Sequence, residues 1–308
     1  MKTRKLRRLI ILGSAIILTP ISPAATVFTG IHVFGDSLSD EGNVSLATGG
    51  ARPGPAYFNG RYSNGRVWVE QLATDHIGIA APAPSLAGGT NHAWAGAVTS
   101  GGAVPPTVPG VLDQINGYGG GFTPTDLVVV WGGANDLLGG ITDPSIPVGN
   151  LVTGIQAVAG AGATTILVPN LPDLADTPAI SSLGEPNITG MRSLTMGFNL
   201  LLDAELASLR TLLPDVTLVG LDIFTLGKDV AADPDAFSLT NVADGALLLG
   251  DIVNANDYVY WDEVHPTGAM HGLIAERAAL ALGIPEPSAV MFLVLGVSGI
   301  LFQRRRLG

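Results

Sequence analysis

Two short segments, far apart in the chain, carry the side-chain types of a nucleophilic hydrolase. Residues 35–38 read Gly-Asp-Ser-Leu and place Ser37 just after the apolar run Ile31 to Phe34. Residues 262–265 read Asp-Glu-Val-His, and one turn of chain allows both end side chains to lie on the same side. A serine nucleophile needs a base and a group that orients the base. Ser37, His265 and Asp262 are the candidates for these three roles.

The same residues also have ordinary structural interpretations. An Asp-Ser pair after a strand is a common helix cap, and a histidine ahead of a helix is often a surface residue. Residues 35–38 also differ from the G-x-S-x-G elbow of the α/β-hydrolases, so that rule does not assign Ser37. The assignment therefore depends on partners elsewhere in the chain.

Asn135 and Gly96 are candidates for stabilising a negatively charged oxygen. Asn135 follows an apolar run and two glycines, which would let its amide point into a cleft above a sheet. Gly96 has no side chain, so its backbone N–H could approach a ligand closely. Alternatively, Asn135 is a turn residue bonded to its own backbone, and Gly96 is a packing contact.

Apolar runs that alternate with helical patterns predict an α/β domain with a mainly parallel sheet and helices on both faces. In such sheets ligands bind outside the carboxyl ends of the strands, where Asp36 and Ser37 fall. The closing helix begins near Pro266, and His271 within it is expected at the surface. We predict strands at 31–34, 127–131, 164–168 and 216–223, and helices at 67–77, 148–159, 188–213 and 266–282.

Charge and composition exclude several classes of protein. Residues 26–284 hold seven basic and twenty-five acidic residues, a balance that would repel the phosphate backbone of a nucleic acid. The chain of 308 residues has no cysteine, which excludes disulfides and thiolate metal sites. The histidines His32, His76 and His92 fall at no metal-ligand spacing, and we expect neither a metal nor a cofactor.

The N-terminal segment has the layout of a secretory signal peptide. Five basic residues precede the apolar run Leu9 to Leu18, and small residues follow up to Ala25. We expect cleavage by signal peptidase near Ala25, and export of the protein. Residues 1–25 are therefore set apart from the fold.

The C-terminal segment, residues 285–308, has three parts. Pro285-Glu286-Pro287 precedes the apolar run Ala289 to Phe302, and three arginines at 304–306 follow. The apolar run is short for a spanning helix, which needs about 20 residues, although flanking residues could extend it. The segment resembles the PEP-CTERM sorting signal, which implies membrane anchoring until an exosortase cleaves it and releases the protein to the cell surface or the extracellular space. A plain tail anchor is the alternative.

In order and type, the four candidate blocks resemble the SGNH/GDSL esterase and lipase family. Residues 35–38, Gly96, residues 133–136 and residues 262–265 correspond to its four motifs, although the second block reads Trp-Ala-Gly-Ala where the family often has paired glycines. The segment 59–68, Asn-Gly-Arg-Tyr-Ser-Asn-Gly-Arg-Val-Trp, also looks like its secreted bacterial branch. The likeness covers nearly all of residues 31–282.

This resemblance implies a three-layer flavodoxin-like fold for residues 26–284 and hydrolysis of carboxylic esters through an acyl-serine. Ser37 would be the nucleophile, His265 the base and Asp262 its orienting acid. The backbone N–H groups of Ser37 and Gly96 and the Asn135 amide would form the oxyanion hole. A glycan O-acetyl esterase, or a surface protein that binds without catalysis on the same fold, are the alternatives.

The substrate is expected to be a small-molecule, lipid or glycan ester, whose acyl chain and alcohol the sequence leaves open. We expect the pocket walls to come from loops at 49–59, 101–118 and 229–257. The last of these is rich in Asp and Asn and could bind calcium, although its spacing is not that of an EF-hand.

Overall fold

The computed structural model describes residues 27–101 and 108–285. The predicted signal peptide and nearly all of the predicted sorting segment lie outside these ranges, so the structure does not test them. No helix within the described ranges is both long enough and apolar enough to cross a membrane.

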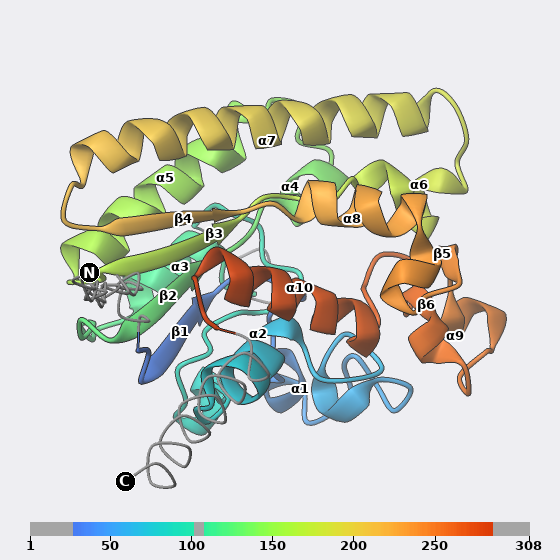
Figure 1. Cartoon of the computed structure of the whole chain (residues 1–308), viewed down its shortest axis with the longest axis horizontal. Coiled ribbons are helices and arrows are strands. Elements are labelled where there is room, and N and C mark those ends of the chain that lie inside the picture. The colour runs from blue at the N-terminus through green and yellow to red at the C-terminus, as the bar shows by residue number, and fades with distance from the viewer. Residues whose placement is uncertain (1–26, 102–107, 286–308) are drawn as a thin grey trace, which may run out of the picture.

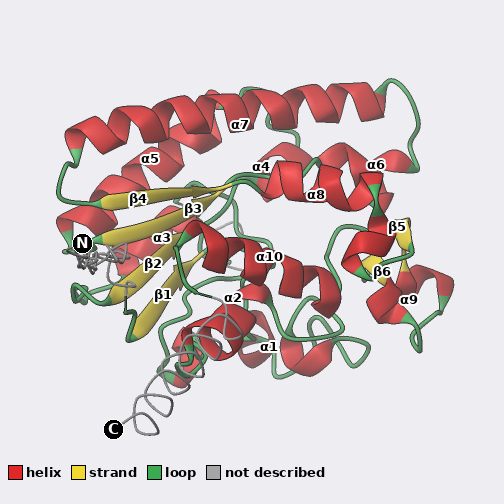
Figure 2. Ribbon diagram, in the orientation of Figure 1, coloured by secondary structure: helices red, strands yellow, loops and turns green. Residues whose placement is uncertain are grey.

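The chain alternates strands and helices, as the sequence predicts (Figures 1 and 2). The predicted strands and long helices are all present, with ends shifted by a few residues. The strands are β1 (Gly30–Phe34), β2 (Asp126–Val130), β3 (Thr165–Pro169), β4 (Thr217–Leu221), β5 (Asn241–Gly245) and β6 (Tyr258–Tyr260). The helices are α1 (Asn43–Ala47), α2 (Trp68–Gln71, continued by a π-helical turn over Leu72–Ile77), α3 (Val111–Gly117), α4 (Ala134–Leu138), α5 (Ser145–Gly160), α6 (Pro178–Ser181), α7 (Asn187–Leu212), α8 (Ile223–Ala232), α9 (Ala246–Leu249) and α10 (Gly268–Ala281).

The central sheet is parallel. Within the described residues its four strands lie in the order β1-β2-β3-β4. On the free side of β1, the backbone of Val33 accepts a hydrogen bond from His92 at 2.7 Å and donates one to Thr90 at 3.1 Å. The segment near Asn91 thus extends the sheet in parallel beyond β1. With this segment counted, the order across the sheet is the Asn91 segment, β1, β2, β3 and β4, which is the strand order of flavodoxin-like sheets.

Helices cover both faces of the sheet, which makes three layers. Because side chains alternate along a strand, Leu127 and Val129 of β2 face α2, α8 and α10, whereas Val128 and Val130 face α3, α5 and α7. All four side chains are fully buried, which explains why the strand reads as a continuous apolar run. Figure 1 shows α5 and α7 on one side of the sheet and α2 and α10 on the other.

The longest helix, α7, follows the sequence pattern directly. Phe198, Leu202, Leu206 and Leu209 recur every three or four residues, and all are buried in the core formed with α5 and the sheet. Thr267 caps the closing helix α10, and its hydroxyl oxygen accepts a hydrogen bond from the Met270 N–H at 3.2 Å. This cap follows Pro266 and fixes where the helix starts.

The prediction for His271 was wrong, because this side chain is completely buried between α10 and α2. Its Nδ1 accepts a hydrogen bond of 3.3 Å from the backbone N–H of Trp68. Burial, with a smaller contribution from the nearby His265, lowers the pKa of His271 from 6.5 to about 3. The imidazole is therefore a neutral core residue of the folded protein.

Because His271 stays neutral in the folded state, the protein should lose stability in acid. Between about pH 6.5 and pH 3 the unfolded chain binds a proton that the folded chain does not, so the free energy of unfolding falls as the pH falls, by up to about 1.4 kcal/mol per pH unit. The variant His271→Asn keeps an acceptor for the Trp68 N–H but does not titrate. Guanidinium unfolding at pH 7 and pH 5 should show a smaller loss of stability for this variant than for the wild type. Equal losses would contradict the assignment.

Candidate active site

Ser37 lies in a sharp turn at the carboxyl end of β1, and Gly35 permits this turn. A Cβ on Gly35 would come within 2.9 Å of the Trp131 carbonyl oxygen, so no side chain fits there. The buried Gln114 amide holds the same residue by donating to its carbonyl at 2.8 Å and accepting from its N–H at 2.9 Å. The serine turn is thus fixed to α3, a helix that the sequence analysis missed.

Two buried aspartates stabilise the turn around Ser37. The Asp36 carboxylate accepts a hydrogen bond from the Leu38 N–H at 3.0 Å. Burial raises the pKa of Asp36 to about 6, although this hydrogen bond and the nearby His265 oppose the rise. Asp40 accepts from the N–H groups of Gly42 at 2.7 Å and Ala95 at 2.9 Å. Asp40 therefore joins the serine turn to the loop that holds Gly96.

Ser37, His265 and Asp262 form an unbroken chain of hydrogen bonds. The Ser37 Oγ lies 2.9 Å from His265 Nε2, and His265 Nδ1 lies 2.7 Å from Asp262 Oδ2. Ser37 and Asp262 are 7% and 8% exposed, so the chain is shielded from solvent while the hydroxyl still borders a cavity. The structure brings these three residues together as the sequence predicts.

The carboxylate of Asp262 is held in its charged form. Burial alone would raise its pKa, but the His265 ring and the backbone N–H groups of Val264 and His265 outweigh burial and lower the pKa to about 2. The two backbone bonds to Oδ1 measure 2.9 Å and 2.8 Å. Asp262 is therefore a fixed negative charge beside the imidazole at any ordinary pH.

Tyr57 is a member of this site that the sequence analysis missed. Its hydroxyl donates to Asp262 Oδ2 at 2.8 Å, the same oxygen that bonds the His265 ring. Burial and the hydrogen bond to Asp262 raise the pKa of Tyr57, so the hydroxyl keeps its proton. No local pattern marks this tyrosine, because its partner lies 205 residues away.

The segment 59–68 holds the loop that carries His265. The Tyr62 ring lies against the imidazole, with ring centroids 5.1 Å apart. The Ser63 hydroxyl donates to the Pro266 carbonyl at 2.8 Å, and the Asn64 side chain accepts from the Gly268 N–H at 2.7 Å. These contacts fix the chain on both sides of the start of α10.

Asn135 is placed at the carboxyl end of β2, in the first turn of α4. Gly133 just before it has φ of 115°, and a Cβ there would meet the Phe198 ring at 2.6 Å. The Asn135 amide donates one hydrogen bond to the Ala97 carbonyl at 2.9 Å, which leaves its second N–H available. Asn135 borders the same cavity as Ser37 and His265.

Gly96 lies in the loop between two tethered residues. Ala95 donates to Asp40 and Ala97 accepts from Asn135, so Gly96 is held beside both the serine turn and the Asn135 turn. Its φ of 86° is in the left-handed region that favours glycine. It is exposed and does not border the cavity, so the structure places Gly96 near the site without showing its N–H directed at Ser37.

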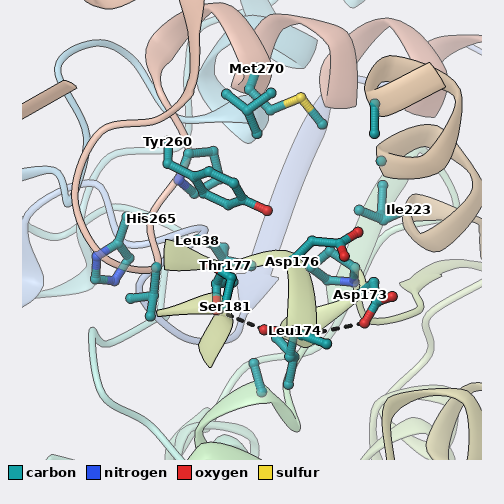
Figure 3. A pocket seen from close by; sticks show the side chains of 18 of the residues that line it. Leu38, Asp173, Leu174, Asp176, Thr177, Ser181, Ile223, Tyr260, His265 and Met270 are labelled. Carbon is teal, nitrogen blue, oxygen red and sulfur yellow. Dashed lines mark hydrogen bonds between the residues drawn. The ribbon is translucent and has the colours of Figure 1, made fainter. Parts of the chain in front are cut away.

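The cavity beside Ser37 has a volume of about 450 Å³ (Figure 3). The prediction of its walls was largely wrong, because described residues of 49–59 and 101–118 do not border it and only four residues of 229–257 do. The largest contributions come from the segment 172–181 after β3 and from α8, and smaller ones from the serine turn, α4, the His265 loop and α10. Helix α8 was missed, although its signal was present: Asp222 caps it, and Ile223, Leu226 and Val230 recur at helical spacing.

Among the described residues, no group of three or more His, Asp or Glu side chains is arranged to hold a metal ion. In the Asp- and Asn-rich segment, the carboxylates of Asp244 and Asp251 accept hydrogen bonds from the side chains of Asn241 and Asn254, respectively, and Asp251 also accepts one from Tyr258.

Several curated proteins resemble this chain. A phosphatidylcholine-sterol acyltransferase of Aeromonas hydrophila is 26% identical, in an alignment that covers 87% of this chain and 94% of that protein. A GDSL esterase/lipase of Arabidopsis thaliana is 25% identical over 82% of each chain. A thermolabile hemolysin of Vibrio parahaemolyticus is 24% identical over 80% of this chain and 62% of its own length.

Solved structures are more distant. A carbohydrate acetylesterase from Sinorhizobium meliloti has 17% identity and a TM-score of 0.47, over 82% of this chain and 96% of that one. A lipolytic G-D-S-L protein from Veillonella parvula has 17% identity and a TM-score of 0.46, with the same coverage.

The family model for GDSL-like lipases and acylhydrolases matches residues 31–278. This span includes the serine turn, the Asn135 turn and the loop with Asp262 and His265. The chain belongs to the GDSL-like lipase/acylhydrolase family and is a carboxylic ester hydrolase.

Proposed function

We propose that this protein is an exported serine esterase or lipase that hydrolyses carboxylic esters through an acyl-serine intermediate. The observation that carries the proposal is the hydrogen-bonded chain from Ser37 through His265 to Asp262. A protein that only binds its ligand has no need to hold a buried aspartate ionised beside a histidine that contacts a serine hydroxyl.

In the first half of the reaction, Ser37 Oγ attacks the carbonyl carbon while His265 Nε2 takes the hydroxyl proton. The ionised Asp262 stabilises the resulting imidazolium. The C–O bond to the alcohol then breaks, and the departing alcohol takes the proton from His265. In the second half, His265 deprotonates a water molecule, the water attacks the acyl carbon, and the free acid and Ser37 are regenerated.

The negative oxygen that forms in each half needs hydrogen-bond donors. We assign this role to the free N–H of the Asn135 amide and to the backbone N–H groups of Ser37 and Gly96. Each donor of this kind typically lowers the barrier by about 3 to 4 kcal/mol. The position of Gly96 between two tethered residues, and the hydrogen bond that holds the Asn135 amide to the Ala97 carbonyl, support this assignment.

Replacing Ser37 by alanine should abolish ester hydrolysis, lowering kcat by at least about 10³-fold, because no nucleophile remains. Hydrolysis of p-nitrophenyl esters measures the rate, and thermal melting should show a folded protein. Ser208→Ala on the exposed side of α7, where the hydroxyl bonds only the Ala204 carbonyl, is the control and should retain wild-type activity. Comparable activity in Ser37→Ala would overturn the proposal.

Tyr57 is proposed as a positioning residue that acts through Asp262. Tyr57→Phe should lower kcat about 5- to 20-fold with little change in KM, because a hydrogen bond to a charged group is lost. In the background of Asp262→Asn the same change should have little further effect. Tyr258→Phe is a matched control, since it also removes a tyrosine hydrogen bond to an aspartate, at 2.9 Å to Asp251 and outside the catalytic chain. Equal losses in both backgrounds would exclude a role through Asp262.

Export is supported by the three-part N-terminal segment and by the tripartite C-terminal end. The mature protein, isolated from its host and analysed by mass spectrometry, should begin near Thr26. If the C-terminal segment is a sorting signal, the mass should also lack the residues that follow the Pro-Glu-Pro motif. A chain that keeps Met1 and remains in the cytoplasm would refute export.

A further inference from the structure

The cavity beside the catalytic chain is lined mainly by apolar side chains. It extends from Ser37 and His265 toward α8 and α10, and its apolar wall comes from the buried residues Trp131, Ile223, Val230, Val259, Met270 and Ile274. Figure 3 shows Met270 and Ile223 lying on different sides of this space. A surface of this kind binds hydrocarbon, because the binding removes apolar area of both the cavity and the ligand from water.

The charged groups of Asp173, Asp176, Arg192 and Lys228 on the wall, and the Thr177 hydroxyl, already have partners. The carboxylates of Asp173 and Asp176 each accept hydrogen bonds of 2.6 Å from both Arg192 and Lys228. The Thr177 hydroxyl donates to the Leu174 carbonyl at 2.7 Å.

The four charges of this ion network balance one another, so the wall offers no spare charge for an anionic ligand. The hydroxyl of Tyr260 does point into the space (Figure 3), but one hydroxyl does not match the many hydroxyls of a sugar. The wall therefore favours an uncharged alkyl chain over a glycan.

Gly227 keeps this space open. It lies one helical turn after Ile223 and ahead of Val230, on the stripe of α8 that borders the cavity. A Cβ built on Gly227 meets no atom within 4 Å. Glycine inside a helix is less favourable than alanine. A glycine at position 227 therefore makes α8 itself less stable, and no feature of the helix requires it. The space beyond it belongs to the cavity.

We propose that this cavity binds the acyl chain of the substrate, that the enzyme prefers esters of unbranched medium-chain fatty acids to acetate esters, and that Gly227 sets the accepted chain length. The proposal rests on the proposed ester hydrolysis at Ser37. At roughly 30 Å³ for a group the size of a water molecule, the cavity volume of about 450 Å³ corresponds to roughly 15 such groups, which is enough for the ester group together with a chain of roughly ten carbons. An acetyl group would leave most of the apolar wall uncovered.

The test measures kcat/KM for p-nitrophenyl esters from acetate to palmitate with the purified full-length protein. For the wild type, kcat/KM should rise several-fold with each added pair of methylenes and reach its maximum near octanoate or decanoate. In Gly227→Leu the ratio of octanoate to acetate activity should fall at least 10-fold, with Gly227→Ala in between. Gly149→Leu is the matched control: Gly149 is also a helical glycine with open space at its Cβ, but it lies on α5, none of whose residues border the cavity. Its octanoate-to-acetate ratio should equal that of the wild type.

A second series keeps the acetyl group and lengthens the alcohol. If Gly227→Leu changes selectivity in this series and not in the acyl series, the cavity holds the alcohol and the proposal is overturned. Serine-dependent hydrolysis that is fastest with acetate would also overturn it, and would leave the proposed esterase function intact. Hydrolysis of none of the esters would overturn both. Circular dichroism of each variant verifies that its helices are formed.

Discussion

The geometry of the site depends on one hydrogen bond between distant parts of the chain, which joins the Ser37 hydroxyl to Nε2 of His265, 228 residues later. Its length of 2.9 Å requires two loops to be placed with an accuracy well under 1 Å. The parallel sheet provides the frame, because the carboxyl ends of its strands meet at one edge. The serine turn follows β1, and the His265 loop follows β6 and leads into α10, which packs on the same sheet.

Buried polar groups connect these loops to one another. Asp40 joins the serine turn to the Gly96 loop, and the carboxylate of Asp136 accepts two hydrogen bonds from Thr99, at 2.9 Å and 2.7 Å, to anchor the same loop near Asn135. On the other side, Tyr57 and Ser63 hold the His265 loop. A buried polar group is costly unless it is bonded. Each of these bonds therefore resists any displacement of the loops, and the site is fixed before the substrate arrives.

The polar and the apolar residues of this site lie in separate regions. Charged and polar groups form the hydrogen-bonded series from Asp262 through His265 to Ser37, to which we assign proton transfer. The space beyond Ser37 is apolar, and the charges on its wall are paired within the ion network of Asp173, Asp176, Arg192 and Lys228. In such surroundings the electrostatic interactions of the catalytic chain are less screened than in water. The same wall would select the hydrocarbon part of a substrate.

The sequence by itself determined what depends on local pattern. The strands and long helices follow from apolar periodicity, and the order of the four motifs identifies Ser37, Asn135, Asp262 and His265 as members of one site. These signals can be read because each is contained in a few neighbouring residues. Helix α8 was not predicted from local pattern. Its apolar residues recur at helical spacing over only ten residues, and the Asp- and Asn-rich segment beside them suggests a loop.

Only the tertiary structure decided which distant residues meet. Tyr57 joins Asp262 across 205 residues, His271 is buried because α10 turns it toward α2, and Gly227 borders a cavity made largely by segments far from it in the chain. None of these has a local signature, because a tyrosine, a histidine or a glycine has the same local preferences whether or not a partner packs against it. Burial and contact arise when the layers close on one another, and only then does each side chain acquire its environment and its role.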